Sequence, residues 1–293
     1  MKNSVRKAVF PVAGLGVRLL PATKTQPKEM LPIVDRPAVQ YVVEEAIASG
    51  LRDLLFVTGR GKRAIEDYFD YAVELEQELK NRGKENLLEE VRGVGNSANI
   101  FYVRQKAPRG LGDAVWQAYS FVGEEPFAVL LPDDIIVSGV PCLAQMLSLW
   151  RERPGVYFAL IEVPPQEVSQ WGIVWGKEIA PSLYLIEDLV EKPEPHEAPS
   201  NLAVVGRYIL PPSIFEALSQ TPPGRGGEIQ LTDALRRLIG KEPMYGYRFQ
   251  GEYFGVGSKI GYLKANVAFA LRRKELADEF REFLRELVKR GLV

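Results

Sequence analysis

The chain has 293 residues, of which 46% are apolar, enough to bury a large core and to exclude global disorder. Its 37 Lys and Arg nearly balance 38 Asp and Glu, so the formal net charge of −1 argues against a broad basic surface for nucleic acid or anionic membrane. The single cysteine, Cys142, excludes an internal disulfide framework and a multi-cysteine metal site, and the single histidine, His196, disfavours histidine-based chemistry.

The N-terminus, Met1 to Lys7, lacks the apolar stretch of a signal peptide. No run of about 18 apolar residues, the length that spans a bilayer, follows it. We therefore expect a cytoplasmic protein with no nucleic-acid partner and no membrane segment.

The first half of the chain alternates between strand and helix patterns, which predicts an α/β fold with a parallel sheet flanked by helices. We expect strands at 7–13, 54–57, 100–103 and 127–131, and helices at 37–47, 62–79 and 113–121. The polar stretch near 81–98 is predicted to be an insertion.

The second half is less regular. Short β-like runs occur at 156–163, 171–175, 183–190 and 202–210, and helical patterns at 229–239 and 260–289. We find no internal repeat, and predict a single domain over residues 1–293 with a helical insertion near 81–98 and a C-terminal helical segment near 259–293.

In open α/β sheets, ligands bind beyond the carboxyl ends of the strands. The first predicted strand runs into Ala13-Gly14-Leu15-Gly16-Val17-Arg18, whose glycines permit a tight, anion-binding loop and whose arginine suits phosphate oxygens. Leu19 replaces the third glycine of the dinucleotide fingerprint, and no Walker loop is present. A glycine turn alone is common, so the loop by itself is weak evidence.

Two further loops carry charge. In Gln26-Pro27-Lys28-Glu29-Met30-Leu31-Pro32, flanking prolines stiffen the backbone around Lys28, although a surface lysine is the ordinary alternative. After the strand at 127–131 come Asp133 and Asp134, a carboxylate pair suited to Mg²⁺ or simply to a turn. Glu191-Lys192-Pro193 ends a later strand, and Glu228 begins a helix that ordinary capping could explain.

These blocks occur in an order that resembles bacterial UTP–glucose-1-phosphate uridylyltransferases. The similarity covers nearly the whole chain and includes segments at 13–18, 20–32, 40–44, 110–115, 131–133, 191–193, 198–208, 228–234 and 257–262. The resemblance implies a Rossmann-like mixed, mostly parallel sheet of nucleotide-diphospho-sugar transferase type. It also implies UTP and glucose 1-phosphate as substrates, UDP-glucose and pyrophosphate as products, Mg²⁺ as cofactor, and a homodimer or homotetramer.

The resemblance assigns roles residue by residue. It places Arg18 and Lys28 on the triphosphate, Lys192 on the sugar phosphate and Asp133 on Mg²⁺. The nucleotide would be bound by Ala13, Gly14, Gly16, Glu29, Gln105 and Gly110. The sugar would be bound by Gly172, Glu191, Val205, Gly206 and Glu228.

The chain departs from the family where a second metal-side aspartate is frequent, because Gly255 stands there. Milder departures are Asp113, where many relatives have histidine, and Val17, where threonine is usual. A weaker or more hydrated Mg²⁺ site is expected, with Asp134 as a possible helper. The open alternatives are a nucleotidyltransferase for dTTP or another sugar, a non-catalytic regulatory relative that binds sugar nucleotides, and a dinucleotide-dependent oxidoreductase.

Overall fold

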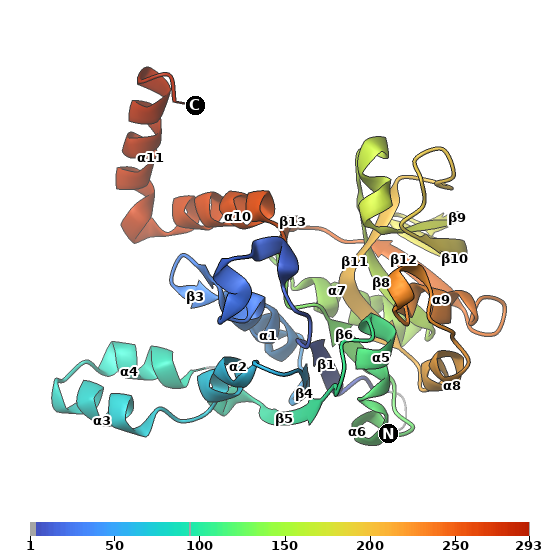
Figure 1. Ribbon diagram of the computed structural model, residues 1–293, viewed down its shortest axis with the longest axis horizontal. Helices are drawn as coiled ribbons and strands as arrows, with labels where there is room; N and C mark the ends of the chain where they lie inside the picture. Colours follow the sequence, from blue (N-terminus) through green and yellow to red (C-terminus); the bar gives the residue numbers. More distant parts are fainter. Residues whose placement is uncertain (1–3, 94, 293) are drawn as a thin grey trace.

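The computed structural model describes residues 4–93 and 95–292 and is built on a mixed sheet (Figure 1). Nine strands form this sheet in the spatial order β5 (Asn99–Arg104), β4 (Asp53–Thr58), β1 (Lys7–Pro11), β6 (Phe127–Leu130), β11 (Leu202–Leu210), β8 (Val156–Glu162), β12 (Met244–Arg248), β10 (Leu183–Glu191) and β9 (Gly172–Ala180). Two small sheets pair β13 (Glu252–Gly255) with β7 (Asp134–Val137), and β2 (Pro32–Ile33) with β3 (Arg36–Pro37).

The direction of the strands divides the sheet in two. Strands β5, β4, β1 and β6 run parallel, so their carboxyl ends share one edge. From β11 onward the pairings are antiparallel except for β12 with β8. The mixed α/β sheet expected from the sequence is confirmed, with its parallel part confined mainly to the N-terminal half.

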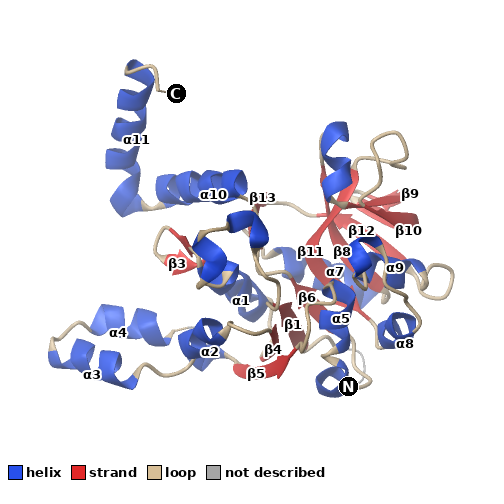
Figure 2. Cartoon of the chain, in the orientation of Figure 1, coloured by secondary structure: helices blue, strands red, loops and turns tan. Residues whose placement is uncertain are grey.

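Helices lie on both faces of the sheet (Figure 2). Their bounds are α1 (Ala38–Ala48), α2 (Arg63–Phe69), α3 (Val73–Asn81), α4 (Glu85–Arg92), α5 (Leu111–Trp116), α6 (Tyr119–Val122), α7 (Cys142–Glu152), α8 (Ser213–Ser219), α9 (Leu231–Arg236), α10 (Lys259–Arg272) and α11 (Lys274–Lys289). Within the described ranges, no helix is long and apolar enough to cross a membrane.

The core has a cluster on each face of the sheet, as the alternation along β1 requires. Ala8 and Phe10 point into one cluster with α1, α7 and part of α10, whereas Val9 points into the other with α5, α8 and α9. All three side chains are fully buried. This double burial explains why β1 consists of consecutive apolar residues rather than alternating ones.

Several expected helices are interrupted or shorter. The helix predicted at 62–79 divides into α2 and α3, because residues 70–72 leave the helical conformation. The helix predicted at 260–289 breaks at Arg273, whose φ of −79° and ψ of 118° are extended. Helix α7, helix α8 and strands β7, β12 and β13 were not predicted.

Two parts of the chain project from the body in Figure 1. Helices α3 and α4 pack on each other as a hairpin, and α4 lies within the polar stretch near 81–98. Helix α10 leads to α11, which turns away at the end of the chain.

Candidate active site

A cavity of ≈ 560 Å³ opens at the carboxyl edge of the parallel strands, beside the loops that follow β1, β5 and β6. The structure thereby gathers segments that are far apart in the sequence. Ten of the residues predicted to bind substrate or metal line this cavity: Ala13, Gly14, Gly16, Arg18, Lys28, Glu29, Gln105, Gly110, Asp133 and Glu228.

The glycine loop after β1 is packed against the loop that carries Lys28. Gly16 has a φ of 68°, which disfavours a side chain, and a Cβ there would lie 3.2 Å from Cβ of Lys28. Thr23 fastens the loop by donating from Oγ1 to the carbonyl oxygen of Gly16 at 2.7 Å. The close approach of the two loops explains why glycine is needed at this position.

Lys28 and Asp133 form an ion pair inside the cavity, with Nζ and Oδ2 2.5 Å apart. Burial alone would lower the pKa of Lys28, but the combined attraction of Asp133, Glu29 and Asp134 raises that pKa. Burial would likewise raise the pKa of Asp133, yet Lys28, with a smaller contribution from Arg18, holds it below its ordinary value. Both groups are therefore charged at neutral pH.

The surroundings of Asp133 fit a cation that is shared with phosphate. Gly257 lies against the carboxylate, since a Cβ there would be 2.6 Å from Oδ2 of Asp133. Among the described residues, no group of three or more His, Cys, Asp or Glu side chains could enclose a metal ion. One ionised carboxylate in a cavity large enough for a nucleotide suits Mg²⁺ when substrate oxygens and water supply its other ligands.

The neighbouring carboxylate, Asp134, is held by other groups. Its Oδ2 accepts from the backbone N–H of Gly206 at 2.8 Å, and its Oδ1 accepts from the Tyr253 hydroxyl at 2.5 Å. Burial and the charge of Asp133 raise the pKa of Asp134 to about 6. A Cβ on Gly255 would lie 2.6 Å from the Tyr253 oxygen, so that phenol occupies the space beside Gly255.

Two buried polar pairs lie at the cavity, where Glu29 and Gln105 belong to its lining. Glu29, 1% exposed, accepts from Nζ of Lys62 at 2.7 Å, and burial raises the pKa of Glu29 although Lys62 opposes the shift. Nε2 of Gln105 donates to Asp113 at 2.7 Å and to the carbonyl oxygen of Gly110 at 3.1 Å. These bonds orient the Gln105 amide, leaving its Oε1 to accept from a ligand.

Apart from Glu228, which lines this cavity, the residues expected on the sugar lie in two places outside its lining. Lys192 Nζ pairs with Oε1 of Glu191 at 2.8 Å, and Oε2 of Glu191 accepts from Thr232 at 2.7 Å. Gly172 is opposite Glu191 in the β9–β10 ladder, where a Cβ would lie 3.4 Å from Oε2 of Glu191. Gly172, Glu191 and Lys192 therefore form one cluster.

Val205 and Gly206 are adjacent on β11 but have different surroundings. The side chain of Val205 packs in the core, so any contact with a ligand would have to come from its backbone. Gly206 lies against the turn after β6, since a Cβ there would be 2.4 Å from Cβ of Leu131 and 2.5 Å from Oδ2 of Asp134.

Sequence reasoning did not anticipate Lys62, Tyr253 or Arg207. Lys62 follows the carboxyl end of β4, the position used to find the other loops, so its location was a usable signal. Arg207 is the one charged residue within the nine residues of β11, which indicates a buried partner. No signal in the sequence pointed to Tyr253.

The sequence pattern of the nucleotidyl transferase family matches residues 7–271. The chain therefore belongs to this family of nucleotidyltransferases.

The relatives are more specific. A UTP–glucose-1-phosphate uridylyltransferase of Bacillus subtilis (strain 168) is 49% identical over 290 residues, 99% of this chain and 98% of that protein. One from Staphylococcus saprophyticus is 48% identical over 285 residues, 97% and 99% of the two chains. A UTP-bound UDP-glucose pyrophosphorylase from Acinetobacter baumannii superposes with a TM-score of 0.89 at 43% identity, covering 97% of this chain and 99% of that one. Another, complexed with UDP-glucose, gives 0.86 at 45%, covering 92% and 100%. The resemblance to UTP–glucose-1-phosphate uridylyltransferases is confirmed.

Proposed function

We propose that the chain transfers the uridylyl group of UTP to glucose 1-phosphate, giving UDP-glucose and pyrophosphate. The observation that carries the proposal is the convergence of Arg18, Lys28 and Asp133 in one cavity with Gln105 and the glycine loop. Near-complete coverage of relatives with this activity supports it. The dinucleotide-dependent oxidoreductase is set aside, because the family and its relatives transfer nucleotidyl groups.

The reaction needs charge compensation more than proton transfer. A phosphate oxygen of glucose 1-phosphate attacks the α-phosphorus of UTP, a new P–O bond forms, and the bond to the β-phosphate breaks to release pyrophosphate. The attacking oxygen is already ionised near neutral pH, so no general base is required. This agrees with the position of His196, which is exposed and not among the residues that line the cavity.

The resemblance assigns the phosphate-binding groups, and their positions support the assignment. Arg18 and Lys28 lie on the wall formed by the glycine loop, where they would bind the triphosphate and offset the charge that develops on the leaving group. Lys192, held by Glu191, would bind the sugar phosphate, and Glu191 would accept from sugar hydroxyls. The remaining sugar contacts would come from Gly172, Val205, Gly206 and Glu228.

The nucleoside end of the cavity suits a uracil base. The backbone at Ala13 and Gly14, together with Gly16 and Gly110, would approach the nucleotide closely, since glycines carry no side chain. Gln105 would accept the imide N–H of the base through Oε1, with Glu29 lying further in.

Asp133 would hold Mg²⁺ together with phosphate oxygens and water. When bound, the ion would neutralise phosphate charge and orient the triphosphate. Asp134 is engaged by Gly206 and Tyr253, which limits the help it can give.

Pyrophosphate release from purified protein with Mg²⁺, glucose 1-phosphate and UTP or dTTP tests the assignment. Release with UTP that Asp133→Ala abolishes supports the uridylyltransferase and shows that Gly255 is tolerated. Preference for dTTP would keep the chemistry and change the substrate, because one methyl group changes binding by only about 1–3 kcal/mol. Binding of UDP-glucose without release from any pair would favour the regulatory relative.

We also propose that the chain forms a homodimer or homotetramer through its C-terminal helices. Exposed apolar side chains lie on both, Ile260 and Leu263 on α10, and Phe283 and Val288 on α11. Helix α11 projects from the body, so its apolar side chains have little core to cover them (Figure 1). Sedimentation should show an oligomer that Phe283→Asp dissociates; a monomeric native protein would contradict this.

A further inference from the structure

The turn that carries Asp133 is held by a buried arginine on the neighbouring strand. Arg207 lies on β11 beside β6, and its side chain has no exposed surface. Its Nη1 donates to the carbonyl oxygen of Leu131 at 3.3 Å, and its Nη2 donates to that of Asp134 at 2.7 Å. The two carbonyls lie on either side of Pro132 and Asp133, so one planar group fastens both ends of the turn.

The backbone of the turn supplies its other restraints. The N–H of Asp134 donates to the carbonyl oxygen of Leu131 at 3.2 Å, and that of Leu131 donates to Gly206 at 2.8 Å. The carbonyl oxygen of Asp133 accepts from the N–H of Val256 at 2.8 Å. Lys28 and Tyr253 donate to the side chains of Asp133 and Asp134, whereas the guanidinium of Arg207 donates to the backbone carbonyls at the two ends of the turn.

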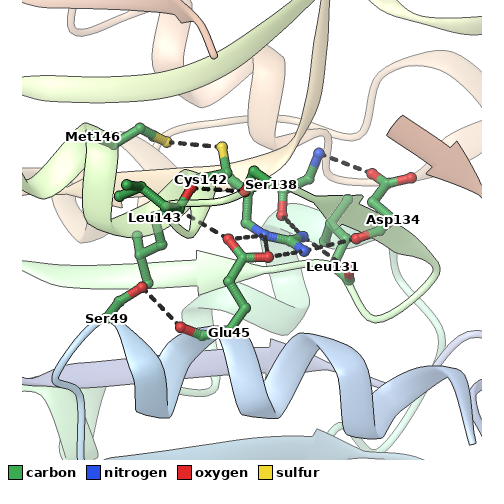
Figure 3. A network of polar contacts seen from close by, with 11 residues as sticks. Glu45, Ser49, Leu131, Asp134, Ser138, Cys142, Leu143 and Met146 are labelled. Carbon is green, nitrogen blue, oxygen red and sulfur yellow. Dashed lines mark hydrogen bonds and ion pairs between the residues drawn. The ribbon is translucent and has the colours of Figure 1, made fainter. Parts of the chain in front are cut away.

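A buried carboxylate anchors this guanidinium. Glu45, on α1, accepts from Nε of Arg207 at 3.1 Å and from Nη2 at 2.8 Å. The same carboxylate accepts from the backbone N–H of Leu143, at the start of α7, at 3.0 Å. Figure 3 shows Glu45 between Leu143 on one side and the turn at Leu131 and Asp134 on the other.

The energetics of this pair favour a role in orientation. Both charged groups are removed from water, and the cost of desolvation generally offsets most of their attraction. Apolar residues of similar volume would stabilise the core at least as well. Apolar residues could not orient the backbone of the turn. The guanidinium of Arg207 does so, because its two donors fix the direction of the carbonyls of Leu131 and Asp134.

We propose that Arg207, anchored by Glu45, is a positioning residue that aims the Asp133 carboxylate at the bound cation. The proposal rests on the metal-binding role proposed for Asp133. Arg207 is fully buried and is not among the residues that line the cavity, so it would act through the turn.

The test uses Arg207→Lys, which keeps the buried charge opposite Glu45 but replaces the planar fork with one ammonium. Mn²⁺ binding to the protein–UTP complex and the Mg²⁺ concentration for half-maximal pyrophosphate release are measured. We expect each to weaken by about 10-fold or more, while the KM for glucose 1-phosphate is unchanged. Tyr157→Phe is the matched control, since its hydroxyl donates to a carbonyl in the same core, that of Arg153 at 2.8 Å, away from the turn.

Each outcome decides between the two proposals. Unchanged metal dependence in Arg207→Lys, with loss in Asp133→Asn, would overturn the role of Arg207 alone. Unchanged Mn²⁺ binding in Asp133→Asn would overturn the metal-binding role, and the positioning role with it. If Tyr157→Phe weakened Mn²⁺ binding as much as Arg207→Lys does, the effect would be explained by a loss of core stability, and the proposal would be refuted.

If Arg207→Lys fails to fold, Glu45→Gln provides the second variant. Its amide retains an acceptor for the guanidinium but removes the anchoring charge. The same direction of change in Mn²⁺ binding is expected, and Mn²⁺ binding equal to that of the native protein would overturn the proposal.

Discussion

Gly255 and Tyr253 are predicted to be coupled, so that the effect of adding a side chain at one depends on the other. In Gly255→Ala the new Cβ would lie 2.6 Å from the Tyr253 oxygen and 3.2 Å from the ring carbon that bears it. The phenol must move, and its hydrogen bond to Asp134 is then lost. The backbone of Gly255 needs no positive φ, so the effect arises from the contact alone.

The magnitude follows from two contributions. Overpacking typically costs about 1–3 kcal/mol, and a hydrogen bond to a charged group contributes about 1.5–3 kcal/mol. We expect Gly255→Ala to lower the free energy of unfolding by about 2.5 kcal/mol or more, the sum of the two lower limits. In a Tyr253→Phe background the shortest contact and the hydrogen bond are both absent, so the same change should cost about 1 kcal/mol or less.

Urea unfolding of the native protein, both single variants and the double variant gives the coupling. A coupling free energy above about 1 kcal/mol is expected for groups in direct contact. Gly139→Ala is the control for the loss of backbone freedom, because a Cβ there meets nothing within 4 Å. Single-variant effects that add to within about 0.5 kcal/mol would refute the reasoning, since they would show that Tyr253 does not occupy this space.

Three further outcomes follow from the site. Lys28→Met should lower kcat/KM for UTP by about 10²–10³-fold in steady-state assays, because it removes one of the cations proposed to bind the triphosphate. An unchanged value would show that Lys28 does not contact the phosphates. Gly110→Ala should destabilise the protein by about 1–3 kcal/mol in urea, since φ is 102° and the Cβ would lie 2.7 Å from Cβ of Glu228. Gly50→Ala, with φ 93° but open space, should cost less. Burial raises the pKa of Tyr208, so the unfolded chain loses this proton first as pH rises. Above about pH 10 stability should fall by up to about 1.4 kcal/mol per pH unit from this group, and Tyr208→Phe should remove that part of the slope.

The parallel half of the sheet could be predicted because its strands are buried on both faces. Ala8, Val9 and Phe10 are consecutive apolar residues, which is the pattern of a strand buried on both faces. Once this strand is recognised, the loop that follows it indicates where the cavity lies. The rule that ligands bind at the carboxyl ends of parallel strands selected both Arg18 and Asp133 from the sequence, and both line the cavity in the structure.

What the sequence did not reveal depends on contacts between distant segments. No glycine or proline marks the break at Arg273, and the apolar pattern continues on both sides of it. The sequence therefore predicted one helix where the structure has two. Strand β13 is defined by pairing with β7, which no local pattern records. The roles of Tyr253 and Arg207 likewise depend on partners more than 70 positions away in the chain.

If Lys28 and Asp133 have the roles proposed above, their ion pair would make the free protein favour a metal–nucleotide complex over either ligand alone. A metal ion arriving alone would take Asp133 and leave Lys28 without its anion, and a nucleotide arriving alone would do the reverse. With the roles proposed for these residues, a metal–nucleotide complex would satisfy both, because the carboxylate would exchange an ammonium for the metal while the ammonium would exchange a carboxylate for phosphate. The binding of the cation and the binding of UTP would then be thermodynamically coupled. Each ligand would strengthen the binding of the other by the same factor.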